Sequence, residues 1–306
     1  MSLPIGYEWR SIVAENLRHT SMKKTLQLES PAKVNLMLRA LRRREDGYHD
    51  IKTIIQKISL HDTLWFTLKR SKGLSISTND RDLPTGEGNL VHRAALLVLE
   101  KSDYKGGVAV RIRKRIPIAA GLGGGSSNAA TTLKALNQLL RLDLPRKELM
   151  RMGLKLGADV PFFLMKGSAL GSGIGERLQE IQLPELWYVL INPNFEVSTA
   201  SVYRKLILTK MRFHYRIQKF FETPEGICHL LLNDLEEVVS RKHPEINEMK
   251  ECLNAAGASA ALMSGSGPTV YGIFPEEGGA LKAYRKIKKS VKGKGWRVLK
   301  AQSIDA

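Results

Sequence analysis

A run of small residues near the middle of the chain has the composition of a phosphate-binding loop. Four of the five residues at 121–125 are glycine, and Ser126 and Ser127 follow them. Glycine leaves the backbone N–H groups uncovered, and apolar residues at helical spacing from Ala129 to Leu140 predict a helix directly behind the loop. The positive end of that helix attracts anions. A simple strand-to-helix turn needs only one or two glycines, so this run predicts a site for a phosphate chain.

The loop matches neither of two common nucleotide-binding motifs. A Walker A motif would contain Gly-Lys-Ser or Gly-Lys-Thr at its end, and a dinucleotide fingerprint would have a third glycine where Ser126 stands. Both serines are candidates to cap the helix or to donate a hydroxyl group to a phosphate or to magnesium. The residues expected to hold the nucleotide are Pro117, Ile118, Ala119, Ala120, Gly121, Leu122, Gly123, Gly124, Gly125, Ser126, Ser127 and Asn128.

A lysine and an asparagine share one face of a predicted strand. Apolar residues alternate from Ala32 to Leu38, which places Lys33 and Asn35 together on the opposite face. Lys33 alone is compatible with a solvated strand lysine, whereas Asn35 beside it favours the wall of a pocket. The turn signal Asp-Gly at 46–47 then predicts a hairpin with Tyr48 and His49 near its bend.

Asp159 is the candidate general base. It follows a helix predicted over 146–156, for which Gly157 is a suitable C-terminal cap, and it precedes Val-Pro, where a helix is predicted to restart. An aspartate in this position is also a good helix N-cap. The sequence leaves both roles open, and one residue can fill both.

The order of the predicted elements is mixed rather than strictly alternating, which favours an α+β chain of two lobes. Further strands are predicted at 51–58, 108–116, 187–191 and 269–274, and further helices at 202–208, 246–256 and 281–291. We expect an N-terminal extension at 1–21, a nucleotide-binding domain at 22–166 and a second domain at 167–306.

Composition restricts the class of protein. The 306 residues carry a formal net charge of +18, and residues 1–166 hold 29 basic and 15 acidic side chains. No run reaches the roughly 18 apolar residues of a membrane span, and two distant cysteines exclude a disulfide scaffold. We therefore expect a cytoplasmic protein without a membrane partner. The charge suits polyanionic small molecules or nucleic acid.

Three motifs, in this order, resemble those of the GHMP kinases. They are Pro-Ala-Lys-Val-Asn-Leu at 31–36, the glycine-rich segment at 117–130 and Met-Ser-Gly-Ser-Gly at 263–267. The resemblance covers nearly everything from Met22 to the end. It implies a two-lobed fold, in which a lobe like a ribosomal-protein βαβ domain and an α/β sandwich-like lobe enclose the active site. It also implies that Mg²⁺ assists transfer of the ATP γ-phosphoryl group to a small alcohol.

The resemblance assigns roles position by position. Asp159 matches the proton acceptor of the family and Lys33 its partner, while Asn89 lies in a segment like that beside adenine. The residues matched to substrate binding are Asn35, Tyr48, His49 and Tyr203, and the two tyrosines would stack on a cytosine ring. The sequences at 46–49 and 157–162 resemble family members that phosphorylate a cytidine-bearing alcohol.

Two alternatives remain at this stage. A GHMP kinase for mevalonate, a sugar or homoserine would have the same glycine-rich loop. A nucleic-acid-binding protein would account for the charge, although the basic residues are scattered and no aromatic-plus-basic RNA motif is present. We expect ATP and a small molecule as the partners, no nucleic acid, and leave the metal ligands and the oligomeric state open.

Overall fold

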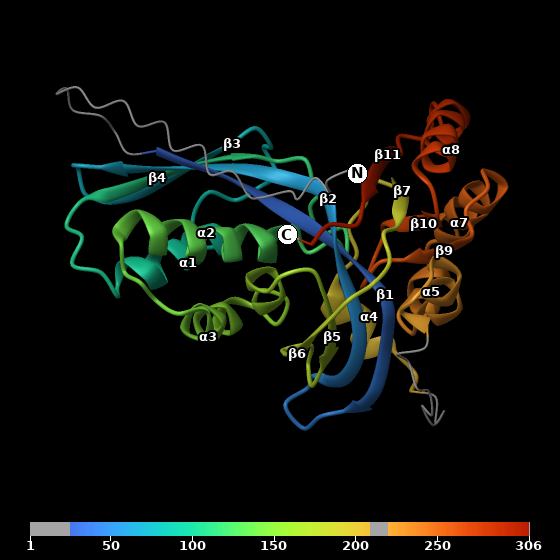
Figure 1. Ribbon diagram of the computed structural model, residues 1–306, viewed down its shortest axis with the longest axis horizontal. Coiled ribbons are helices and arrows are strands. Elements are labelled where there is room, and N and C mark those ends of the chain that lie inside the picture. The colour runs from blue at the N-terminus through green and yellow to red at the C-terminus, as the bar shows by residue number, and fades with distance from the viewer. Residues whose placement is uncertain (1–24, 209–219, 306) are drawn as a thin grey trace, which may run out of the picture.

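Two β-sheets organise the chain in the computed structural model, which describes residues 25–208 and 220–305 (Figure 1). The first sheet contains β1 (Thr25–Arg43), β2 (His49–Lys69), β3 (Gly73–Thr78), β4 (Gly107–Arg113), β5 (Ser168–Ser172), β6 (Arg177–Ile181) and β8 (Leu232–Asn233). The second contains β7 (Trp187–Asn192), β9 (Ala260–Met263), β10 (Val270–Phe274) and β11 (Arg297–Gln302). The predicted α+β class is confirmed. The extension predicted at 1–21 lies outside the described residues.

β1 and β2 form a long antiparallel pair that crosses the molecule (Figure 1). Both strands run well beyond the predicted 32–38 and 51–58, because pairing continues through three register shifts, one of them between Asn35 and Met37. The predicted hairpin is confirmed, since Arg44 N donates to Tyr48 O at 2.8 Å across the turn. The turn therefore brings Tyr48 and His49 to the end of the strand pair.

Three α-helices cover one face of the first sheet (Figure 1), and a short 3-10 helix joins the same hydrophobic core. The α-helices are α1 (Leu90–Leu99), α2 (Gly124–Leu140) and α3 (Arg146–Leu156), and the 3-10 helix is η1 (Pro161–Leu164). The helix predicted behind the glycine run is confirmed as α2, and α3 has the predicted bounds. The helix expected to restart at Asp159 is only the four residues of η1. Asp159 therefore lies in the turn between α3 and η1.

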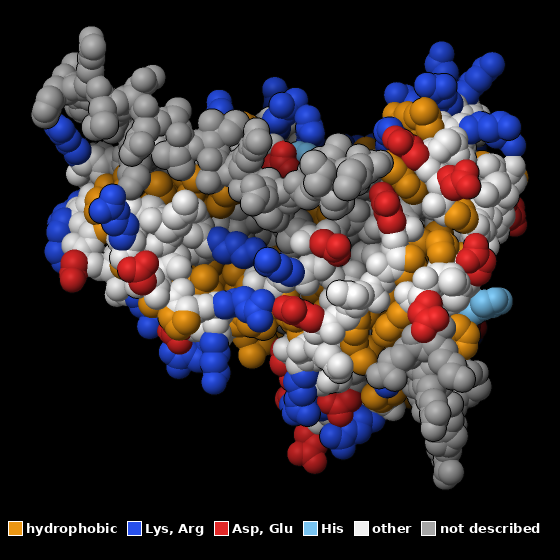
Figure 2. Space-filling view, viewed as in Figure 1, with side chains coloured by type: hydrophobic (Ala, Val, Ile, Leu, Met, Phe, Trp, Pro, Cys, Tyr) orange, Lys and Arg blue, Asp and Glu red, His pale blue; other side chains and the backbone are white. Residues whose placement is uncertain are grey.

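The remaining helices belong to the second half of the chain. They are α4 (Thr199–Lys205), α5 (Pro224–Leu230), α6 (Glu236–Ser240), α7 (Glu245–Ala255) and α8 (Glu277–Ser290). The helix predicted at 202–208 begins and ends three residues earlier, because Ser198 caps it by accepting a hydrogen bond from Ser201 N. Lys and Arg side chains gather over α8 in Figure 2 and are otherwise spread over this face. None of the helices among the described residues is long and apolar enough to cross a membrane.

The second sheet supports the back of β1. Ala32, Val34 and Leu36 pack with side chains of β7 and β10 in one buried cluster. Tyr271 on β10 also donates its hydroxyl to the backbone oxygen of Asn35 at 2.8 Å. β5 and β6 join the first sheet through β2, so the predicted domain boundary between 166 and 167 does not coincide with a change of sheet.

Candidate active site

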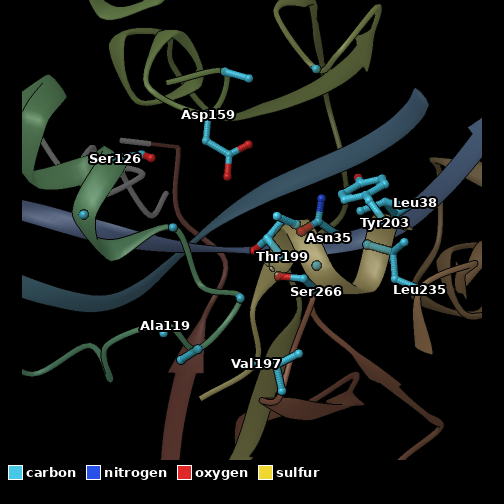
Figure 3. A pocket seen from close by; sticks show the side chains of 18 of the residues that line it. Asn35, Leu38, Ala119, Ser126, Asp159, Val197, Thr199, Tyr203, Leu235 and Ser266 are labelled. Carbon is cyan, nitrogen blue, oxygen red and sulfur yellow. Dashed lines mark hydrogen bonds between the residues drawn. The ribbon is translucent and has the colours of Figure 1, made fainter. Parts of the chain in front are cut away.

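A cavity of about 940 Å³ opens between the glycine-rich loop, the hairpin end of β1 and β2, and α4 (Figure 3). Asp159 and Ser126 lie on one side of it, and Tyr203 lies on another. The charged side chains that line it are the cations Lys33, Arg43, Lys114 and Arg204 and the carboxylates Asp46 and Asp159. This excess of positive charge favours anionic ligands.

The glycine-rich loop approaches β1 and η1 so closely that one position accepts only glycine. Gly123 caps α2 with a φ of +69°, and a Cβ atom there would lie 2.9 Å from Cζ of Phe163 and 3.0 Å from Cγ of Lys33. The first N–H groups of α2, from Gly124 onward, have no partner within the helix. Gly124, Gly125 and Ser126 line the cavity, so these donors are available to a bound anion.

The third sequence motif closes against the same loop. A Cβ atom on Gly121 would lie 2.1 Å from the backbone oxygen of Ser264. The Ser264 hydroxyl donates to the backbone oxygen of Gly121 at 3.0 Å and accepts from Asn35 N at 3.3 Å. Ser266 bonds Thr199 of α4 at 2.7 Å. The three motifs, distant in the sequence, therefore form one site.

Lys33 and Asp159 meet in this site. Lys33 Nζ lies 3.9 Å from Oδ2 of Asp159 and donates to Oδ1 of Asn35. Burial lowers the pKa of Lys33, and the charge of Asp159 partly offsets that effect. The predicted contact, and the shared face of Lys33 and Asn35, are confirmed. Asp159 does not cap η1: the N-cap position is Val160, and no side chain caps this helix.

The aromatic side of the cavity differs from the expected pair of tyrosines. Tyr203 contacts the ring of His49, with 5.2 Å between centroids, whereas Tyr48 is 60% exposed. A base sandwiched between Tyr48 and Tyr203 is therefore not a preformed arrangement, because His49 already contacts the Tyr203 ring. Nδ1 of His49 is buried and has no hydrogen-bond partner. Burial, followed by the nearby Arg43, lowers the pKa of His49 and favours its neutral form.

Four residues predicted to hold the nucleotide do not line the cavity. Ser127 is buried and accepts a hydrogen bond from Ser30 at 2.7 Å, and Asn128 donates to Asp62 at 3.0 Å. Asn89 caps α1 by accepting from Val91 N. Leu122 is buried as well, and its backbone oxygen accepts from Lys33 N. Their side chains support the loop and the helices from behind.

Lys114 is a wall residue that the sequence interpretation missed. Its Nζ lies 2.9 Å from Oδ2 of the fully buried Asp62, and a Cβ atom on Gly124 would lie 3.2 Å from it. A cation therefore lies beside the first residue of α2. The strand pattern could have identified it: Arg113 and Arg115 point outward, so alternation predicts that the side chain of Lys114 points inward.

The chain matches two family models in order: GHMP kinases N terminal domain at residues 89–167, and GHMP kinases C terminal at residues 220–293. A protein of Syntrophus aciditrophicus named 4-diphosphocytidyl-2-C-methyl-D-erythritol kinase is 50% identical over 285 residues, which are 92% of this chain and all of the relative. A protein of the same name from Geobacter sulfurreducens is 49% identical over 261 residues, covering 85% of this chain and 94% of the relative.

Solved structures agree with these matches. A crystal structure of 4-(cytidine 5'-diphospho)-2C-methyl-D-erythritol kinase is 34% identical, with a TM-score of 0.78, and the match covers 92% of this chain and all of the other. A homoserine kinase from Cytophaga hutchinsonii, at 22% identity and a TM-score of 0.71, shares the fold. Fold and site thus define the class, an ATP-dependent kinase of small molecules. The chain belongs to the GHMP kinase family, within the group of 4-diphosphocytidyl-2-C-methyl-D-erythritol kinases. The predicted two-lobed fold and enzyme class are confirmed.

Proposed function

We propose that the protein transfers the γ-phosphoryl group of ATP to the 2-hydroxyl group of 4-diphosphocytidyl-2-C-methyl-D-erythritol, in the non-mevalonate route to isoprenoid precursors. The products are the 2-phosphate and ADP. The observation that carries the proposal is the approach of Lys33 to Asp159 at 3.9 Å, beside the N-terminus of α2. The names of the relatives support the choice of alcohol. As a small-molecule enzyme, it would act in the cytoplasm without a nucleic-acid partner.

The nucleotide would bind along the glycine-rich loop. Uncovered N–H groups at 124–126 and the positive end of α2 would hold the β- and γ-phosphates. Lys114, beside Gly124, would add a positive charge next to them. Because these groups are fixed before the reaction, they stabilise the charge that spreads over the transferred phosphoryl group in a loose transition state.

Asp159 would accept the proton of the alcohol. As the hydroxyl oxygen bonds to the γ-phosphorus, the bond from phosphorus to the oxygen of ADP breaks and the hydroxyl proton passes to the carboxylate. Asp159 is 43% exposed along its side chain and lines the cavity, so a substrate can reach it. The ammonium group of Lys33, 3.9 Å from that carboxylate, would offset the negative charge that develops during the transfer.

Magnesium would complete the nucleotide site. Among residues 25–208 and 220–305, no three or more His, Cys, Asp or Glu side chains gather as a metal site. Kinases usually hold Mg²⁺ through one or two side chains and the phosphates themselves, so a full protein cage is not required. The Ser126 hydroxyl is an oxygen donor on the cavity wall (Figure 3), and it fits that role. When bound, the ion would neutralise charge on the phosphates.

The cytosine end of the substrate would bind at His49 and Tyr203. His49 lines the cavity beside Tyr203, and the ring of Tyr203 offers a stacking surface for a base. Asn35 would contact the alcohol, since its amide is anchored between Lys33 and Thr53. A binding site at each end of the substrate would fix the hydroxyl group relative to Asp159.

The test measures ADP release with ATP, Mg²⁺ and 4-diphosphocytidyl-2-C-methyl-D-erythritol, beside parallel reactions with mevalonate and homoserine. We expect turnover on the cytidyl substrate alone and its loss in Asp159→Asn. Turnover that survives in Asp159→Asn would remove the base assignment but keep the kinase. Preference for mevalonate or homoserine would overturn the substrate assignment. RNA binding with a steep salt dependence, in the absence of turnover, would contradict the proposal as a whole.

A further inference from the structure

The segment that carries Asp159 ends in backbone oxygens held by two lysines. Successive turns fix its first part, because Val160 N donates a hydrogen bond to Gly157 O at 3.1 Å and Phe163 N donates one to Val160 O at 3.2 Å. The last carbonyl groups of a helix have no intrahelical donors, and lysine side chains can supply them. Lys134 of α2 donates to Phe163 O at 2.8 Å. Lys57 of β2 donates to Met165 O.

Lys57 is only 1% exposed, and lysine side chains are rarely buried to this extent. Its ammonium group lies 5.6 Å from the centroid of the Phe162 ring. The pKa of Lys57 is lowered to about 7, mainly by burial and then by the charge of Lys134, while Glu180 of β6 and Asp305 near the C-terminus oppose the shift. A buried cation costs stability, which a methionine of similar shape would not. The hydrogen bond that Lys57 donates to Met165 O offsets part of that cost.

The same segment contacts the catalytic wall on its other side. A Cβ atom added to Gly123 would lie 2.9 Å from the Phe163 ring and 3.0 Å from the aliphatic part of Lys33. Val160 packs against α3 so closely that a Cβ atom on Gly153 would lie 2.9 Å from it. A shift of the 157–165 segment would therefore move Asp159 relative to both Lys33 and the nucleotide loop.

We propose that Lys57 and Lys134 are positioning residues for phosphoryl transfer. By holding the backbone oxygens of Met165 and Phe163, they fix the segment so that the Asp159 carboxylate stays against Lys33. Neither lysine lines the cavity, so both act through the segment and not through substrate. The inference rests on the proposed role of Asp159 as proton acceptor.

The experiment compares Lys57→Met and Lys134→Met in the full chain with Lys166→Met, an exposed lysine next to Met165 that serves as the matched control. ATP-binding stoichiometry gives the concentration of intact sites. In each positioning variant we expect kcat to fall at least tenfold, with KM for ATP and for the cytidyl alcohol within threefold of the parent. Lys166→Met should keep the parent kcat.

A second comparison places each change in an Asp159→Asn background and follows product formation in single turnovers. If the lysines act through Asp159, they lose their effect there, and each double variant is no slower than Asp159→Asn. An equal fold-loss in both backgrounds, or an unchanged kcat in folded Lys134→Met, would overturn the inference. Should Lys57→Met fail to fold, the exposed Lys134 decides the outcome alone. A parent-like rate in Asp159→Asn would instead overturn the proposed base.

Discussion

Lys33 and Asp159 lie 3.9 Å apart but differ sharply in exposure, with side chains 5% and 43% accessible. The lysine comes from the buried centre of β1, and the aspartate comes from the turn before η1. The cation is therefore fixed from behind, while the carboxylate stays open to a ligand in the cavity. A proton acceptor needs this combination, because it must reach the substrate while a fixed cation stays beside it.

Replacing the carboxylate by an amide should remove most of the rate. We expect Asp159→Asn to lower kcat by about 10²–10⁴-fold, because an amide cannot accept the hydroxyl proton. KM for ATP should change by less than threefold, since the phosphates are held by the loop. Steady-state ADP release gives both constants. Asp103→Asn, an exposed aspartate away from the cavity, is the control. Comparable losses in both variants would contradict the role.

The fall of kcat at alkaline pH should follow the loss of the proton from Lys33. Burial lowers its pKa below the ordinary value of 10.5. The protonated form is the one that stabilises Asp159, so the rate should fall as pH rises through this lowered pKa. In Lys33→Arg the guanidinium group stays protonated, and we expect the alkaline fall to disappear even if the maximum rate is reduced. kcat measured from pH 6 upward checks this. If kcat still falls at alkaline pH in Lys33→Arg, the titration of another group causes that fall.

A single methyl group at position 123 should damage the nucleotide site. In Gly123→Ala, the added Cβ would meet Phe163 and Lys33 at about 3 Å on a backbone with φ +69°. We expect a loss of tenfold or more in kcat/KM for ATP, because the loop or the lysine must shift. Gly278→Ala in α8, where nothing lies within 4 Å of the new Cβ, should leave kcat/KM for ATP unchanged. Equal effects would show that the close packing is unimportant.

Local patterns predicted the parts of the site that depend on neighbours in sequence. The glycine run followed by apolar residues at helical spacing predicted α2, and alternation along β1 predicted that Lys33 and Asn35 share a face. The meeting of Lys33 with Asp159 came from family resemblance, because no local pattern relates a strand to a distant turn. The same is true of the loop at 264–267.

Contacts made only in three dimensions escaped prediction. Ser127 resembles a phosphate ligand in sequence, but its first-turn position faces Ser30 and the core. Tyr203 was expected to face Tyr48, yet the neighbouring strand residue His49 points toward it instead. Lys57 belongs to a buried stretch of β2, and its partner Met165 is remote in the chain. Such pairs become visible only when the sheet and the helices are assembled.

The ring of Tyr203 should matter for one substrate alone. We expect Tyr203→Ala to raise KM for the cytidyl alcohol at least tenfold, since stacking of a base on an aromatic ring contributes about 1–3 kcal/mol. KM for ATP should stay within twofold. Tyr203→Phe keeps the ring and should stay close to the parent, which separates stacking from hydrogen bonding by the hydroxyl group. Equal increases in both KM values would indicate a general disturbance of the cavity.

The buried ion pair behind the loop should be a large contributor to stability. Asp62 is fully buried, lies 2.9 Å from Lys114, and accepts from the N–H groups of Arg115 and Ile116 at 2.7 and 2.9 Å. Asp62→Ala would leave a buried cation, two backbone N–H groups and the side-chain amide of Asn128 without this acceptor. Removing one partner of such a pair typically costs about 3–5 kcal/mol of unfolding free energy.

Urea unfolding of Asp62→Ala measures this cost, and the exposed pair Glu237–Arg241 provides the matched control. Glu237→Ala should change the free energy of unfolding by less than about 0.5 kcal/mol, because solvent screens that pair. A loss below about 1 kcal/mol in Asp62→Ala would mean that water enters the site or that Lys114 loses its proton. Loss of the Lys114 proton would also remove the positive charge beside the first residue of α2, so in that case KM for ATP should rise in the folded Asp62→Ala protein.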